Sequence, residues 1–162
     1  WLLINLATAS TAGFVISRFS ATLDQMVVIA SFMPVVAGVA GNGATQALAV
    51  TIRKIATDGV LSKQYLSVIT KELLVALING VILGLIVGGV AWGLNSNPML
   101  GAVVTFALVG NLLVAGFAGS AIPLFLQRFG VDPAVASSIL MTAFTDILGY
   151  TLLLGLGTML LL

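Results

Sequence analysis

One carboxylate, Asp146, stands near the middle of an apolar run that covers residues 132–162. A helix that begins at Pro133 would place Asp146 about 20 Å along its axis, because a helix rises about 1.5 Å per residue. That depth is near the midplane of a bilayer, where an ionised aspartate costs about 2.5 to 3.5 kcal/mol on insertion scales. We therefore expect Asp146 to face a partner, a water-filled cavity or an ion.

Two polar groups of residues are candidates for the surroundings of Asp146. The first lies in the same run as Asp146 and consists of Ser138, Thr142, Thr145 and Gly149. Together with Asp146 these residues recur at spacings of three and four, which predicts one helix face. The second lies in the run 25–57 and consists of Gly41, Asn42, Gly43, Thr45 and Gln46. Its glycines would admit a hydrated ligand, and its amides can bond to water around a cation, but close helix packing explains the glycines equally well.

The composition indicates an all-α integral membrane protein. Of the 162 residues, 60% are hydrophobic and only 7% are charged, against roughly 25% charged residues in an average soluble domain. The absence of Cys and His excludes thiolate chemistry, imidazole metal sites and His acid/base catalysis. Intramembrane aspartyl proteolysis needs two carboxylates close together, and we find one at depth, so we do not expect an enzyme. No nucleic-acid partner is expected either.

We predict a single transmembrane domain over residues 1–162 with five helices, each long enough for the roughly 20 residues of one crossing. The expected helices cover about residues 1–19, 25–57, 71–94, 98–125 and 133–161. Residues 20–24 would form a polar turn and 57–71 an aqueous connector. Glu72 then stands at a helix N-terminus, where a negative charge is favourable. Gly80, Gly84 and Gly88 would form a seam of tight helix contact.

Basic residues predict the orientation, because they concentrate in cytoplasmic loops. One side would hold Arg53, Lys54, Lys63, Lys71 and Arg128, and the other only Arg18. The N-terminus would therefore be cytoplasmic and the C-terminus outside. Because the chain starts without Met and without a basic region typical of signal peptides, we expect it to be a domain of something longer.

A cation site is the chemistry that these residues suit. One carboxylate neutralises a divalent ion poorly, but a two-fold homodimer would bring two copies of Asp146 together on its axis. Every ligand on offer is a hard oxygen, which suits Mg²⁺, Ca²⁺ or Mn²⁺ better than Zn²⁺ or Cu²⁺. Ca²⁺ recruits about six to eight direct oxygen ligands, whereas Mg²⁺ keeps its water, so this sparse set favours Mg²⁺.

Two stretches carry a resemblance to a known family. Residues 34–46, with Gly41-Asn42-Gly43-Ala44-Thr45-Gln46, resemble the second transmembrane helix of MgtE-type magnesium channels. Asp132-Pro133, followed by Thr142 and Asp146, is similar to the fifth helix of that family. The resemblance extends over essentially the whole chain.

The resemblance implies a homodimer in the cell membrane, embedded in the lipid bilayer. Its second and fifth helices would line a pore at the dimer axis that conducts hydrated Mg²⁺ down its electrochemical gradient, with Mn²⁺ or Ca²⁺ as alternative occupants. Asp146 matches the pore aspartate, Thr142 a backbone-carbonyl position and Asn42 the asparagine of the glycine-rich patch. Ser138 departs from the asparagine that some members have near the ion. The family also commonly carries a cytoplasmic N-terminal regulatory region with CBS domains, which these residues do not include.

Two other hypotheses would also explain these residues. A divalent-cation exchanger coupled to H⁺ or Na⁺ would use Asp146 as a group that is protonated in turn. A packing or anchoring bundle would explain the glycine seams but would leave the intramembrane charge of Asp146 without a purpose.

Overall fold

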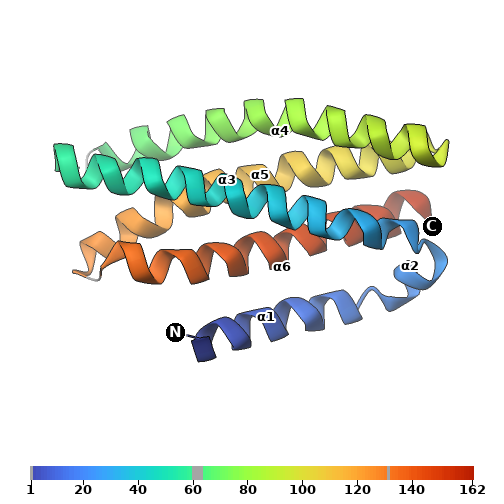
Figure 1. Ribbon diagram of the computed structural model, residues 1–162, viewed down its shortest axis with the longest axis horizontal. Helices are drawn as coiled ribbons and strands as arrows, with labels where there is room; N and C mark the ends of the chain where they lie inside the picture. The colour runs from blue at the N-terminus through green and yellow to red at the C-terminus, as the bar shows by residue number, and fades with distance from the viewer. Residues whose placement is uncertain (1, 60–63, 131) are drawn as a thin grey trace.

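The computed structural model describes residues 2–59, 64–130 and 132–162, without the side chains of residues 58 and 134–136. The described part consists of α-helices and the short turns between them. Its elements are α1 (Leu2–Ser17), α2 (Ser20–Gln25), α3 (Val28–Asp58), α4 (Tyr65–Asn95), α5 (Pro98–Arg128) and α6 (Pro133–Leu161). The four longest helices lie side by side and alternate in direction, with the N-terminus towards one end of the bundle and the C-terminus at the other (Figure 1).

Helix α5 is the centre of the bundle. It packs against α3, α4 and α6, whereas α1 packs mainly against α6 at one edge. Small residues on α5 allow this close packing: a Cβ at Gly101 would lie 2.7 Å from the Gly88 carbonyl oxygen of α4. The hydroxyl of Thr105 also donates a hydrogen bond to the Gly84 carbonyl, at 3.0 Å. The predicted glycine seam is therefore a tight contact between α4 and α5.

The beginning of α4 differs from the prediction. The helix starts at Tyr65 rather than at residue 71, because Tyr65, Val68 and Ile69 pack with Leu124 of α5 in a small apolar cluster. Glu72 therefore lies beyond the first turn, and its interpretation as an N-terminal charge is wrong.

Two other predicted boundaries also move. The expected polar turn after residue 19 contains the short helix α2. Helix α5 continues through Pro123 to Arg128, past the predicted end at residue 125. Proline is tolerated inside membrane helices because neighbouring groups satisfy the backbone it frees. The start of α5 is as predicted, with the Asn97 side chain accepting hydrogen bonds from the Met99 and Leu100 amides.

Among the described residues, four helices, α3 to α6, contain segments long and apolar enough to cross a membrane: Val28–Thr57, Tyr65–Asn95, Pro98–Arg128 and Ser137–Leu161. Their outer surfaces carry many exposed large hydrophobic side chains, as lipid contact requires. Helix α1 has 16 residues and would span about 24 Å at about 1.5 Å per residue, less than a hydrocarbon core of about 30 Å. A fifth crossing by α1 therefore stays a prediction.

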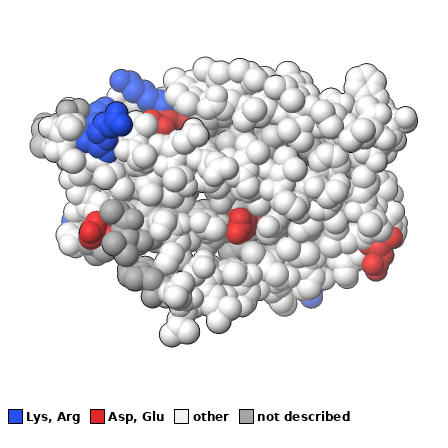
Figure 2. Space-filling view, viewed as in Figure 1, with Lys and Arg blue, Asp and Glu red and all other residues white. Residues whose placement is uncertain are grey.

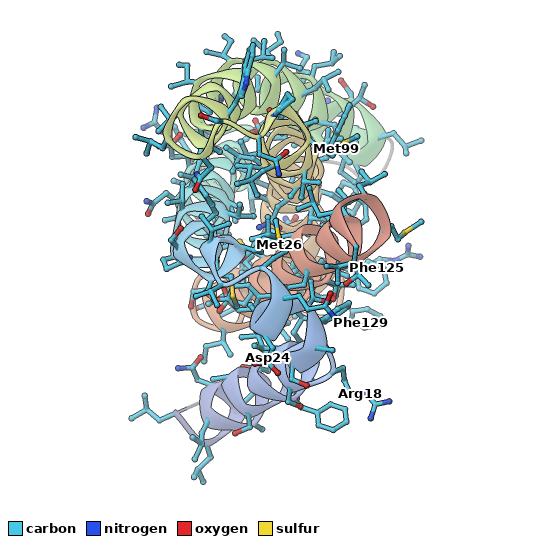
Figure 3. All side chains as sticks on the ribbon, turned by 90° about the vertical axis from the view of Figure 1, so that its right-hand side faces the viewer. Arg18, Asp24, Met26, Met99, Phe125 and Phe129 are labelled. Carbon is cyan, nitrogen blue, oxygen red and sulfur yellow. The ribbon has the colours of Figure 1, made fainter. Side chains whose placement is uncertain are left out.

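Most charged side chains on this face lie towards the two ends of the molecule, and one acidic group lies on the otherwise uncharged surface between them (Figure 2). Arg53, Lys54 and Lys71 belong to the end where α3 finishes and α4 begins, and Lys63 lies outside the described residues. Arg18 and Asp24 belong to the segment from the end of α1 to α2 at the opposite end, and Figure 3 shows them on the same side of the bundle, away from Met99. The predicted orientation in the membrane depends on this distribution of basic residues between the two ends. The orientation itself stays a prediction.

Candidate functional site

Helices α3 and α6 enclose a hollow of about 450 Å³ that is open to the surface of the single chain. Its lining consists of Pro34, Ala37, Gly38, Gly41, Asn42, Thr45, Thr142, Asp146 and Tyr150. We call it the α3–α6 hollow. Two stretches that are 100 residues apart in the sequence thus meet, and five of the predicted site residues meet with them: Gly41, Asn42, Thr45, Thr142 and Asp146.

Asp146 is the one acidic residue among the described residues that line this hollow. Its side chain is half-buried, and no described residue forms an ion pair or a hydrogen bond with its carboxylate. The described residues also contain no group of three or more His, Cys, Asp or Glu side chains that could hold a metal ion. A cation at Asp146 would therefore depend on water, on neutral oxygens or on a second protein chain.

Neutral oxygens surround the carboxylate on both helices. The Asn42 side chain is exposed in the hollow and has no hydrogen-bond partner among the described residues. The Thr45 hydroxyl donates to the Gly41 carbonyl of its own helix at 2.9 Å. Tyr150, which was not predicted as a site residue, lies one turn beyond Asp146, and this spacing of four was the signal that could have identified it.

Ser138 lies next to this hollow and not within it. It lines a neighbouring space of about 270 Å³ between α1 and α6, together with Leu2, Asn5, Ile139 and Thr142. Thr142 lines both spaces, and its hydroxyl donates to the Ser138 carbonyl at 2.9 Å. The two spaces therefore follow each other along α6.

Thr145 and Gly149 face the interior of the bundle. Thr145 is fully buried, and its hydroxyl donates to the Met141 and Thr142 carbonyls, each at 3.1 Å. Gly149 is buried against the side-chain amide of Asn111 on α5, where no Cβ would fit. Since the polar stripe covers roughly 100° of the helix circumference, only one edge of it faces α3.

Gly43 and Gln46 lie on the other side of α3. Both line a separate pocket of about 210 Å³ that also includes Glu72 and Asn79 of α4. Neighbouring residues on a helix differ by about 100° in direction, so a continuous polar patch in the sequence divides between two faces.

Asn111 of α5 connects α3 and α6, the two helices that line the hollow. It is fully buried, and its amide donates to the Val36 carbonyl of α3 at 3.1 Å while it contacts Gly149 of α6. A buried Asn on a membrane helix was visible in the sequence, but its connection of α3 with α6 was not.

A family model described as a divalent cation transporter, MgtE, matches residues 33–156. These residues include the complete lining of the α3–α6 hollow. The chain belongs to the MgtE family. Three curated relatives, each called Magnesium transporter MgtE, match nearly all of it: the protein of Bacillus subtilis is 34% identical over 98% of this chain, that of Thermus thermophilus 32% over 99%, and that of Enterococcus faecalis 30% over 98%.

The chain spans 35 or 36% of the length of these relatives. Members of this family are membrane proteins, in agreement with the four long apolar helices. The resemblance inferred from Asn42 and Asp146 is thus confirmed at the level of the family.

Proposed function

We propose that this chain forms the membrane pathway of a magnesium transporter, with the α3–α6 hollow as half of a pore. The observation that carries this proposal is the position of Asp146, a carboxylate at membrane depth in a hollow that holds no basic residue. An intramembrane carboxylate without a counter-charge is costly, and a cation in the hollow would offset that cost. The names of the three relatives support Mg²⁺ as this cation.

The complete pore is a homodimer in this proposal. One chain supplies a single carboxylate, which compensates only half of the charge of a divalent ion. Since the hollow is open on the surface of the chain, a second copy related by a two-fold axis would close it and contribute its own Asp146. The two copies together would provide two carboxylates and two sets of amide and hydroxyl groups.

The ion passes this site with most of its water. Mg²⁺ gives up water reluctantly, and the side chains near Asp146 are too few for a dry coordination shell. Asp146 would accept hydrogen bonds from the bound water, Asn42 and Thr142 would contact other water molecules of the shell, and Ser138 would contact the hydrated ion further along α6. Mn²⁺ and Ca²⁺ are alternative occupants of the same site.

We propose passive conduction across the cell membrane, governed in the whole protein by a cytoplasmic regulatory region. Transport rather than catalysis is the role of Asp146 in this proposal, as the names of the three relatives support. The mechanism is tested with the purified chain in proteoliposomes under a Mg²⁺ gradient, first without and then with imposed H⁺ and Na⁺ gradients.

Passive conduction predicts Mg²⁺ flux without any counter-ion gradient and a current that reverses at the Mg²⁺ equilibrium potential. Flux that requires an H⁺ or Na⁺ gradient would replace the channel by an exchanger. An absence of flux under all three conditions would contradict a self-sufficient pathway. Protein-free liposomes of the same lipid measure the leak.

A further inference from the structure

A second polar pocket lies on the opposite side of α3 from the hollow. It is the pocket of about 210 Å³ among α3, α4 and α5, and we call it the lateral pocket. Its polar side chains are Gln46, Glu72 and Asn79. At about 100° per residue, the α3 residues of the lateral pocket and those of the hollow are centred on opposite faces of the helix. The two spaces are therefore separate.

Glu72 is a second carboxylate within a helix that is long and apolar enough to cross a membrane. Since α4 begins at Tyr65, Glu72 lies about 10 Å along the helix at about 1.5 Å per residue, beyond the free amides of the first turn. The side chain is half-buried, and no described residue forms an ion pair or a hydrogen bond with it. The neighbouring Lys71 is exposed and does not line the pocket. Glu72 therefore has no charged partner within the described part of the chain.

Two amides accompany this carboxylate. Asn79 lies seven residues after Glu72 and thus on the same face of α4, and Gln46 approaches from α3. Neither amide has a hydrogen-bond partner among the described residues. Together the three side chains present hard oxygen atoms, and the lining contains no basic residue. This combination suits a cation and excludes an anion.

The floor of the pocket is built from close helix contacts. A Cβ at Gly116 of α5 would lie 3.0 Å from the Glu72 carbonyl oxygen and 2.6 Å from the Ala76 Cβ. A Cβ at Gly43 would lie 2.8 Å from a methyl group of Leu112. These contacts hold the backbones that carry Gln46 and Glu72 at a defined separation, so the space between the polar side chains is part of the packing.

We propose that the lateral pocket binds a divalent cation, which keeps most of its water and is held mainly by the Glu72 carboxylate. The amide oxygens of Gln46 and Asn79 contact its water molecules. The pocket of about 210 Å³ is large enough to hold an ion together with water molecules. The site is distinct from the proposed pore and does not depend on the role of Asp146.

The test counts bound Mn²⁺ by electron paramagnetic resonance, which detects the free ion. The protein carries Asp146→Asn throughout, so that the pore carboxylate is absent, and is placed in nanodiscs of phosphatidylcholine. The variant Glu72→Gln is compared with Asp24→Asn, which removes the same charge from an exposed residue at the end of the bundle. Gln46→Ala, away from the carboxylate, is a second variant of the pocket. Competition with Mg²⁺ follows each titration.

We expect the Asp24→Asn protein to bind one Mn²⁺ per chain, which Mg²⁺ displaces. Glu72→Gln should lose this ion. Gln46→Ala should weaken its affinity at least about threefold, a difference of about 0.65 kcal/mol. Equal binding in Glu72→Gln and Asp24→Asn would overturn the proposal. So would a protein that binds no Mn²⁺ but retains phosphatidylethanolamine in a Glu72-dependent manner, since the occupant would then be a lipid ammonium group. The two proposals can fail separately. If Asp146→Asn alone leaves the Mg²⁺ flux unaltered, the pore proposal fails, but the number of Mn²⁺ ions bound at the lateral pocket is unaffected.

Discussion

The side-chain amide of Asn111 on α5 donates a hydrogen bond to the Val36 carbonyl of α3, with 3.1 Å between nitrogen and oxygen. The same amide contacts Gly149 of α6, so one side chain defines the relative position of the two helices that line the hollow. Such a residue acts on the site through geometry and not through contact with the ion.

Replacing Gly149 tests this contact. The added methyl group of Gly149→Ala would collide with the Asn111 amide, and we expect a loss of about 1 to 3 kcal/mol in the free energy of unfolding. Combining it with Asn111→Ala should recover at least about 1 kcal/mol relative to the sum of the single changes, because the two side chains compete for one space. Unfolding by sodium dodecyl sulfate in mixed micelles measures all three variants.

Gly155→Ala is the matched control on the same helix. A Cβ at Gly155 meets no atom within 4 Å, so this change should be neutral or slightly stabilising. Additive losses for Gly149→Ala and Asn111→Ala would contradict the proposed competition.

The two faces of α6 can be distinguished by cysteine labelling, since the chain contains no Cys. Thr142 is exposed in the hollow, whereas Thr145 is fully buried. We expect a water-soluble methanethiosulfonate to modify Thr142→Cys at least about ten times faster than Thr145→Cys, because thiol reactivity requires access. Labelling at equal rates would instead place Thr145 in the water-filled path.

The seam between α4 and α5 predicts opposite effects for two adjacent glycines. A Cβ at Gly88 would lie 2.5 Å from the Gly101 carbonyl oxygen, and one at Gly89 would meet no atom within 4 Å. Gly88→Ala should therefore lose about 1 to 3 kcal/mol of stability, whereas Gly89→Ala should gain up to about 1 kcal/mol through helix propensity. The same unfolding titration measures both, and similar effects would argue against a seam.

Much of the site could be predicted because membrane helices restrict polar residues strongly. Asn42 and Asp146 were visible as costly groups at depth, and the structure brings them into one hollow. Periodicity alone could not show whether Thr145 and Gly149 face the hollow or the interior of the bundle. It defines a polar stripe on the helix, but not which edge of that stripe meets a neighbouring helix. That choice is made by α5, whose Asn111 occupies the space in front of Gly149.

Glu72 illustrates a second limit. The charged pair Lys71-Glu72 looked like a boundary between water and membrane, but the apolar side chains of Tyr65 and Val68 extend the helix by packing on Leu124. This is a contact between distant parts of the chain, which no local pattern reports. The mistaken helix start concealed that Glu72 lies within α4 and lines a pocket.

The most direct test of the central claim is Mg²⁺ flux into proteoliposomes that contain either Asp146→Asn or Asp24→Asn. Both variants lose one carboxylate, but only Asp146 lies in the α3–α6 hollow. If Asp146 holds the conducted ion, Asp146→Asn should lower the flux at least about tenfold, a loss of about 1.4 kcal/mol or more, while Asp24→Asn should keep it. Equal flux through the two folded variants would contradict the assignment of the α3–α6 hollow as the ion pathway.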